Sequence, residues 1–183
     1  MERTLIKDTV NKVDQVVRVS GYVHSRRDHG KIVFLDLWDR SGTIQVVMMG
    51  DLAGDLRDQD VVNIEGKVAA RPEKLFNLDL ETGKVELQGE KVEVLAKAAE
   101  LPFDMGQKDL DLQLPTLLDH RSLTLRHPKV QAIFKVQSVV IDSFREFMKQ
   151  NDFFEFQAPS IVPAVAEGGA EVFKVNYFDY KAF

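Results

Sequence analysis

The chain has 183 residues, of which 44% are hydrophobic, and its formal net charge is −5. The length allows one large domain or two small ones, and the composition is ordinary for a globular protein with a real core. The absence of cysteine excludes disulfides and thiolate zinc sites and fits a reducing compartment. The negative charge argues against binding nucleic acid through overall positive charge, although it allows a local basic patch.

Targeting and metal-binding patterns are missing from the sequence. No apolar run reaches the roughly 20 residues that a membrane-spanning helix needs, and the N-terminal stretch MERTLIKDTVNK lacks the apolar core of a signal peptide. We therefore expect a cytoplasmic protein without a membrane partner. The four histidines have no metal-site spacing, and neither a nucleophile elbow nor a phosphate-binding loop is present, so we expect no metal ligand.

Residues 1–98 have the pattern of an all-β domain. Short apolar and β-branched runs alternate with turn-like segments such as DHG and DRSG. Residues 51–58, after the third run, can hold a short helix. Five strands with a helix or loop after the third are typical of the OB-fold, a small barrel that binds oligonucleotides across its second and third strands. The predicted strands are Val16–Arg26, Lys31–Trp38, Thr43–Met49, Val61–Ala70 and Lys84–Ala96.

The pattern changes after residue 98. Residues 99–120 contain Pro102 and Pro115 but no clear period, so we expect a hinge there. Apolar residues then recur at helical spacing from Pro128 to Gln150. A short strand in FFEFQAP, a glycine-containing loop and strand-like FKVNYF follow. One helix and two strand fragments cannot close a core, so residues 121–183 are interpreted as the interrupted start of an α/β domain.

Phe34 falls on the polar side of its predicted strand. If Val33 and Leu35 face the core, strict alternation directs Phe34 outward, and the same argument directs Gln45 outward on the next strand. Alternation adds Arg26 and Glu86 to this face and leaves Arg27 and Asn77 in the adjoining loops.

This combination of side chains suits a few unstacked bases. An aromatic ring can stack on a base, amides and carboxylates can bond to its Watson–Crick edge, and arginines can hold phosphates. The alternative is that a loop covers Phe34 and that Gln45 is only solvated. We favour base recognition because the residues occur together on an OB-like frame.

Two stretches resemble class IIb aminoacyl-tRNA synthetases, and specifically the aspartyl-tRNA synthetases of archaeal and eukaryotic type. RRDHGKIVFLDLWDRSGTIQVV is similar to their anticodon-binding barrel. The stretch from LDHRSLTLRHP to FKVNYF is similar to the start of their catalytic domain, an antiparallel sheet with helices. The resemblance implies an aspartate–tRNA ligase that uses ATP and Mg²⁺, forms aspartyl-adenylate and acts as a homodimer. Together with the sequence pattern, it implies an OB-fold anticodon-binding domain at residues 1–98 and a hinge at residues 99–120. The start of the catalytic domain, which includes motif 1, would follow at residues 121–183.

The resemblance also assigns residues. Phe34 would stack on the central anticodon uridine, and Gln45 would hydrogen-bond to it. Arg26 or Arg27 would bind the anticodon backbone. Asn77 and Glu86 would contact the first anticodon base. The anticodon set implied is Arg26, Arg27, Phe34, Gln45, Asn77 and Glu86.

Further residues are assigned in the second half of the chain. Phe144, Phe147 and Pro159 would belong to motif 1, which builds the dimer interface, and Glu167 would meet the amino-acid substrate. The motifs that hold ATP and Mg²⁺ would lie beyond Phe183. We therefore expect no catalytic residue within these 183 residues, and no aminoacylation by them alone.

Two alternatives stay open. The first is an asparaginyl-tRNA synthetase or a ligase that charges both tRNA-Asp and tRNA-Asn. The loop EGGAEVF favours an aspartyl enzyme over an asparaginyl enzyme. His24 favours relaxed tRNA specificity, because some members restricted to tRNA-Asp carry Trp at this position. The second is a non-catalytic OB-fold module that binds nucleic acid.

Overall fold

The computed structural model describes residues 1–106, 109–161, 175–178 and 180–182. These residues form two compact units, Met1–His127 and Pro128–Phe183. We call them the barrel unit and the C-terminal unit and describe each by itself. The boundary between the two units lies after His127 in the chain. The domain boundaries expected at residues 98 and 120 remain predictions.

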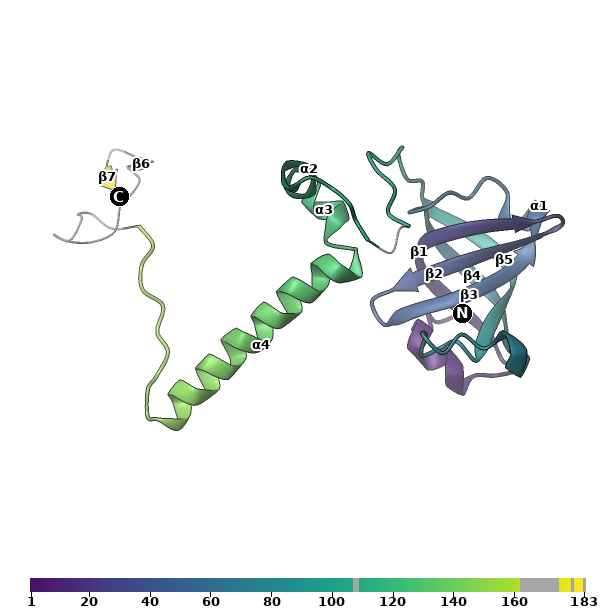
Figure 1. Cartoon of the computed structure of the whole chain (residues 1–183), viewed down its shortest axis with the longest axis horizontal. Coiled ribbons are helices and arrows are strands. Elements are labelled where there is room, and N and C mark those ends of the chain that lie inside the picture. The colour runs from purple at the N-terminus through teal and green to yellow at the C-terminus, as the bar shows by residue number, and fades with distance from the viewer. Residues whose placement is uncertain (107–108, 162–174, 179, 183) are drawn as a thin grey trace. The chain divides into compact units, whose positions relative to one another are not determined.

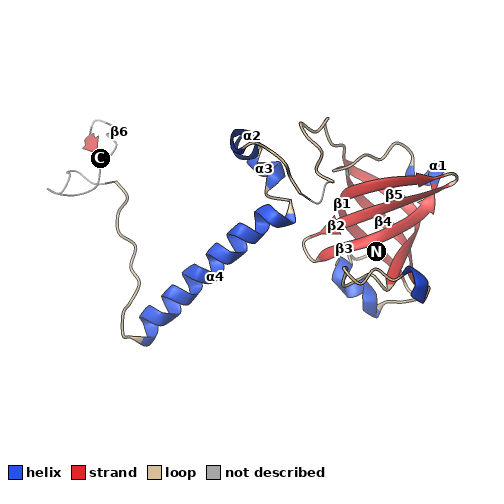
Figure 2. Cartoon of the chain, in the orientation of Figure 1, coloured by secondary structure: helices blue, strands red, loops and turns tan. Residues whose placement is uncertain are grey.

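Five strands of the barrel unit close into a barrel in the order β1-β2-β3-β5-β4. Figures 1 and 2 show these strands wrapped into the barrel. β3 and β5 run parallel, and the other neighbours run antiparallel. This arrangement confirms the predicted OB-fold, and β1 continues past its predicted end. The strands are β1 Val16–His29, β2 Ile32–Asp39, β3 Gly42–Met49, β4 Val61–Ala70 and β5 Val85–Ala96.

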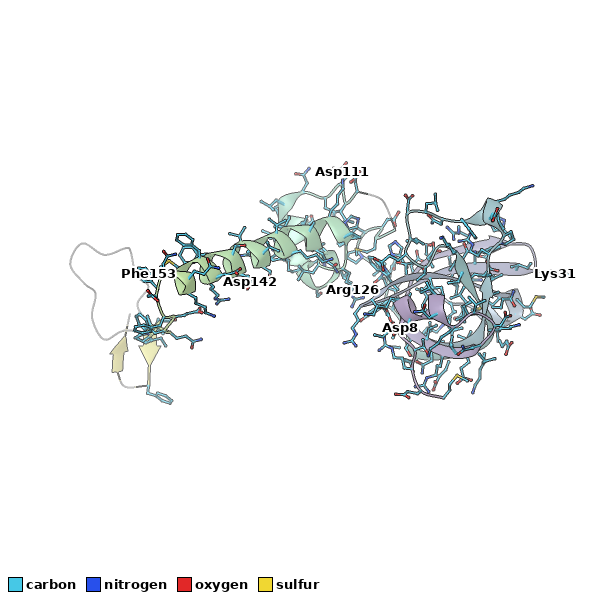
Figure 3. All side chains as sticks on the ribbon, turned by 90° about the horizontal axis from the view of Figure 1, so that it is seen from below. Asp8, Lys31, Asp111, Arg126, Asp142 and Phe153 are labelled. Carbon is cyan, nitrogen blue, oxygen red and sulfur yellow. The ribbon has the colours of Figure 1, made fainter. Side chains whose placement is uncertain are left out.

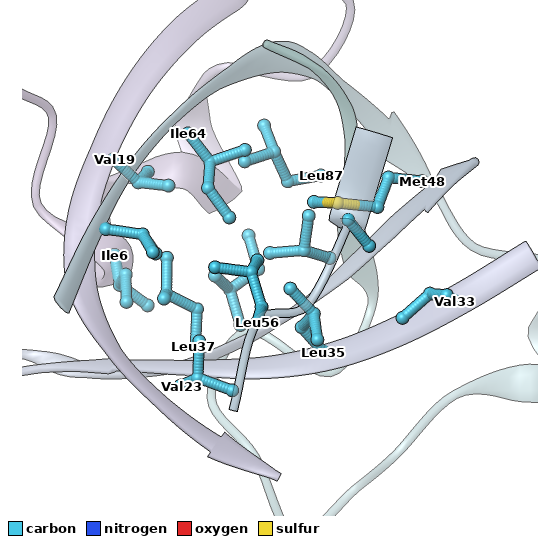
Figure 4. Close-up of a cluster of buried hydrophobic side chains, with 14 of the residues drawn as sticks. Ile6, Val19, Val23, Val33, Leu35, Leu37, Met48, Leu56, Ile64 and Leu87 are labelled. Carbon is cyan, nitrogen blue, oxygen red and sulfur yellow. The ribbon is translucent and has the colours of Figure 1, made fainter. Parts of the chain in front are cut away.

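Alternate residues of every strand fill the barrel. Val33, Leu35 and Leu37 of β2 are almost fully buried, as are Ile44 and Val46 of β3. Figure 4 shows these rows converging with residues of β1, β4 and β5. Burying each such side chain contributes about 1.5–3 kcal/mol. The predicted inward rows of β2 and β3 are therefore confirmed, and their other residues are left on the outside.

Short elements complete the core. The 3₁₀ helix η1, Ile6–Asn11, inserts Ile6, whose backbone N–H donates to Asp39 at 3.1 Å. The helix α1, Gly50–Ala53, lies where a helix was expected, and Leu56 after it also joins the core. A second 3₁₀ helix, η2 at Glu73–Leu75, begins the connection from β4 to β5.

The segment predicted as a hinge contains a helix. It holds α2, Leu114–Asp119, and is followed by α3, Arg121–Thr124. Both helices are too short to show a helical period in the sequence. Arg126 donates to Gln59 at 2.9 Å, and its guanidinium lies 4.3 Å from the centre of the Tyr22 ring. These contacts attach the end of this segment to the barrel.

The C-terminal unit contains α4, Pro128–Gln150, with the predicted bounds. The strand predicted over residues 153–159 is wrong, because these residues pair with no strand among the described residues and a strand needs a hydrogen-bonded neighbour. The strand predicted in FKVNYF is present as β6, Val175–Tyr177, which pairs with β7, Tyr180–Ala182. Within the described ranges, no helix is long and apolar enough to cross a membrane.

The packing of β2 predicts a large difference between two substitutions in that strand. Leu35 is 0% exposed and Ile32 is 41% exposed. Leu35→Ala should lower the free energy of unfolding of the barrel by about 2–5 kcal/mol, because it leaves a cavity. Ile32→Ala should change it by less than about 0.5 kcal/mol.

Urea denaturation followed by fluorescence measures this difference, since Trp38, the only tryptophan, lies on β2. Similar losses for the two variants would contradict the assignment of the inner row.

Candidate nucleic-acid interface on the barrel

One extra residue in β1 changes which side chains share the face of Phe34. Val23 pairs with Leu37, whereas Ser25 pairs with Asp36, so the register shifts at His24. Beyond this β-bulge the alternation of β1 is inverted relative to β2. The His24 ring packs on Trp38, with ring centres 4.6 Å apart.

The expectation that Arg26 lies beside Phe34 is therefore wrong. Arg26 pairs with Leu35 of the inner row and donates to the backbone carbonyls of Gly54 and Leu56 at 2.8 and 2.9 Å. Its guanidinium also forms two hydrogen bonds to Asp28, at 3.1 and 2.9 Å. These bonds lower the pKa of Asp28 and raise that of Arg26. Arg26 thus fastens the segment after α1 to β1.

Arg27 takes the place that Arg26 was expected to have. It pairs with Phe34 across the β1–β2 ladder, and directly opposite residues of such a pair share a face. Its guanidinium lies 3.0 Å from Asp36 and its side chain is 50% exposed. Asp36 also accepts a hydrogen bond from Ser25 at 2.6 Å. Arg27 is therefore oriented by one carboxylate but remains open to solvent.

Phe34 lines an open hollow of about 480 Å³. The His29 ring meets it edge to face, with ring centres 5.4 Å apart, so the side of Phe34 is supported. The sequence did not predict His29 in this site, because the strand was expected to end at Arg26 and not at His29. Lys31 lies at the tip of the same β1–β2 hairpin (Figure 3). The hollow is lined by Arg27, His29, Ile32, Phe34 and Gln45.

Gln45 belongs to a polar group that includes one residue not predicted. Its side-chain amide donates to Glu86 at 3.4 Å, and Arg71 lies 3.8 Å from the same carboxylate oxygen. The Nε–H of Arg71 is buried and has no hydrogen-bond partner. No pattern in the sequence indicates a role for Arg71, because its position next to Pro72 favours a plain loop. Together these side chains offer donors and acceptors beside the aromatic hollow.

Asn77 lies on the connection between β4 and β5. Its side-chain oxygen accepts the backbone N–H of Asp79 at 3.1 Å, and its side chain is exposed. The backbone of this connection is joined to β3 through Thr82, whose hydroxyl donates to the carbonyl of Thr43. The loop that contains Asn77 is thus attached to β3, the strand of Gln45, and leads into β5, the strand of Glu86.

The remaining predicted residues lie in the C-terminal unit. Phe144 and Phe147 of α4 are 64% and 62% exposed, and Pro159 is exposed beyond the helix. Glu167 lies outside the described residues. In the part of the chain that the structure describes, no group of three His, Asp or Glu side chains could hold a metal ion.

Comparison with protein families matches both halves of the chain. Residues 17–95 match the OB-fold nucleic acid binding domain of the tRNA anticodon family, and residues 113–183 match the tRNA synthetases class II (D, K and N). The chain therefore joins an OB-fold nucleic acid binding domain to sequence of the class II tRNA synthetases. This result confirms the resemblance that its motifs indicated.

Individual proteins agree with the family. An aspartate–tRNA(Asp/Asn) ligase of Archaeoglobus fulgidus is 39% identical over 92% of this chain and 40% of its own length. A solved candidate aspartyl-tRNA synthetase from Leishmania major matches all of this chain and 38% of its own, at 25% identity and a TM-score of 0.81. Asparaginyl-tRNA synthetase from Pyrococcus horikoshii, solved with asparaginyl-adenylate, matches all of this chain and 42% of its own, at 29% identity and a TM-score of 0.78. The chain thus spans less than half the length of these proteins.

The inverted alternation of β1 predicts different roles for its neighbouring arginines. Arg26→Ala should lower the free energy of unfolding by about 1–3 kcal/mol, because two backbone carbonyls lose their donor. Arg27→Ala is the matched control and should cost less than about 1 kcal/mol, because its ion pair with Asp36 is half exposed.

Urea denaturation of the two variants tests the bulge directly. A larger loss for Arg27→Ala than for Arg26→Ala would mean that β1 alternates without interruption.

Proposed function

We propose that this chain serves aspartate–tRNA ligation and that its barrel reads the anticodon. The observation that carries the proposal is the outward Phe34, which lines a hollow with Arg27 and lies on the strand next to the Gln45–Glu86 pair. An aromatic ring next to an amide and a carboxylate suits unstacked bases, and a half-exposed arginine suits a phosphate. The name of the Archaeoglobus relative supports tRNA-Asp and tRNA-Asn as the two partners.

The anticodon assignments that we propose rest on the family resemblance, and this geometry supports them. Phe34 stacks on the central uridine, Gln45 bonds to its edge, and Glu86 and Asn77 address the first base. Arg27 binds the backbone beside Phe34. Arg26 supports the barrel and contributes to binding only by holding β1 in place.

The C-terminal unit contributes to the catalytic domain in this proposal. Glu167 meets the ammonium group of aspartate, and ATP and Mg²⁺ support adenylate formation in the cytoplasm. We assign no residue of this chain to ATP or Mg²⁺, and we expect these 183 residues alone to give no ATP–pyrophosphate exchange.

The α4 helix is also proposed to join two copies of the chain. Phe144 and Phe147 are exposed on α4, and an apolar hollow of about 580 Å³ includes Phe144 and Phe153. Monomeric proteins rarely expose apolar patches of this kind. A homodimer would cover this helix face, with Pro159 at its edge.

Titration of labelled anticodon stem-loops tests the proposed RNA site. The chain should prefer GUC and GUU loops over an unrelated loop. Phe34→Ala should weaken binding to the preferred loops by about 1–3 kcal/mol, because a stacked base loses its platform. Phe103→Ala is a suitable control, since it removes a ring that contacts His120 instead.

Equal, salt-sensitive binding to all three loops, unchanged by Phe34→Ala, would contradict anticodon reading. That outcome would favour the non-catalytic nucleic-acid module considered from the sequence. A preference for GUC over GUU would narrow the partner to tRNA-Asp.

Sedimentation velocity tests the proposed dimer. The chain should sediment as a dimer at micromolar concentration, and Phe144→Asp should shift it to monomer because a charge would be buried at the interface. Asp142→Ala is the control, because residue 142 lies about 200° around the helix from residue 144.

A monomeric wild-type chain would refute the proposed interface. The same conclusion would follow if Phe144→Asp and Asp142→Ala behaved alike.

A further inference from the structure

The connection from β4 to β5, residues 71–84, is closed on itself by backbone hydrogen bonds. We call it the Asn77 loop. The N–H of Asn77 donates to the carbonyl of Gly83 at 3.1 Å, and the N–H of Gly83 donates to Leu80 at 3.0 Å. Leu80 in turn donates to the carbonyl of Asn77 at 3.3 Å. The position of Asn77 is therefore tied to the other end of its own loop.

Thr82 joins this loop to the strand that carries Gln45. The threonine is 2% exposed, and its hydroxyl donates to the carbonyl of Thr43 on β3. Thr43 precedes Gln45 by two residues, so both point to the same face of β3, about 7 Å apart along the strand. The carbonyl of Thr82 also accepts the N–H of Val85, which precedes Glu86. Thr82 thus contacts the backbone two residues before Gln45 and one residue before Glu86.

Gly83 lets two parts of the loop pass closely. A Cβ atom on Gly83 would lie 1.7 Å from the carbonyl oxygen of Asn77, a distance that no side chain tolerates. A glycine is required here because two backbone segments approach one another. Any larger residue would push the backbone of Asn77 away from its present place.

We propose that Thr82 and Gly83 are positioning residues that determine anticodon specificity. They fix the position of the Asn77 side chain relative to Glu86, so that these two groups match the edge of the first anticodon base, next to the uridine that Gln45 addresses. The inference rests on the proposed anticodon function and adds residues that would not touch the RNA. Residues with a purely structural role would affect only the stability of the barrel, whereas these positioning residues would also affect the choice between bases.

Thr82→Val tests the inference, because it keeps the shape of the side chain and removes its donor. The ratio of affinities is measured between a GUC stem-loop and a CUC stem-loop, which differ only in the first anticodon base. We expect Thr82→Val to reduce this ratio roughly tenfold, the effect of losing about one well-placed hydrogen bond. Affinity for an unrelated loop should not change, and Thr82→Ser should restore the wild-type ratio.

Two further variants separate positioning from stability. Asn77→Ala removes the positioned side chain, and adding Thr82→Val to it should cause little further loss, because coupled residues are not additive. Gly83→Ala should reduce the ratio in the same direction, and Thr82→Ala, which removes the same donor without adding a methyl group, serves if Thr82→Val does not fold. Trp38 fluorescence in urea reports the stability of each variant.

The outcomes distinguish this inference from the proposed function. A wild-type chain that prefers GUC, with variants that lose stability but keep the wild-type ratio, would overturn the positioning role alone. A wild-type chain without any preference would overturn both.

Discussion

The candidate site depends on the closure of the barrel. β5 pairs in parallel with β3 and antiparallel with β4, and β4 returns to β1, so every strand has two neighbours. Closure removes the free edges of the sheet and fixes its inner rows. Because one face of each strand packs in the core, the side chains of the opposite face are held in fixed positions toward solvent. Phe34 stands on this outer face because Val33 and Leu35, on either side of it, are buried.

The electrostatics of this face are local. The chain is negative overall, and Asp36 and Glu86 lie on the proposed RNA face itself. Each carboxylate is close to an arginine, Asp36 to Arg27 and Glu86 to Arg71. The carboxylates thus orient cationic groups and can accept hydrogen bonds from a base. Such a surface favours selective contacts over the non-specific attraction of a uniformly basic patch.

The C-terminal unit presents a different physical situation. Its helix forms with the predicted bounds, but its phenylalanines remain exposed along the described chain. Helical periodicity reports which residues share a face, and it does not reveal what will cover that face. The same limit explains the missing strand at residues 153–159, where an apolar sequence pairs with no strand in the part of the chain that the structure describes.

The sequence by itself determined the five strands, the inward rows of β2 and β3, the long helix and the family, because these depend on local periodicity and on contiguous motifs. Only the tertiary structure decided which arginine shares the face of Phe34. A bulge at His24 inverts the alternation of β1, and pairing with another strand reveals it where the sequence of β1 does not. Tertiary structure also brought in Arg71, His29 and Thr82, whose contacts lie on other strands or beyond the predicted end of β1. Their roles depend on closure of the barrel, which joins residues far apart in the chain.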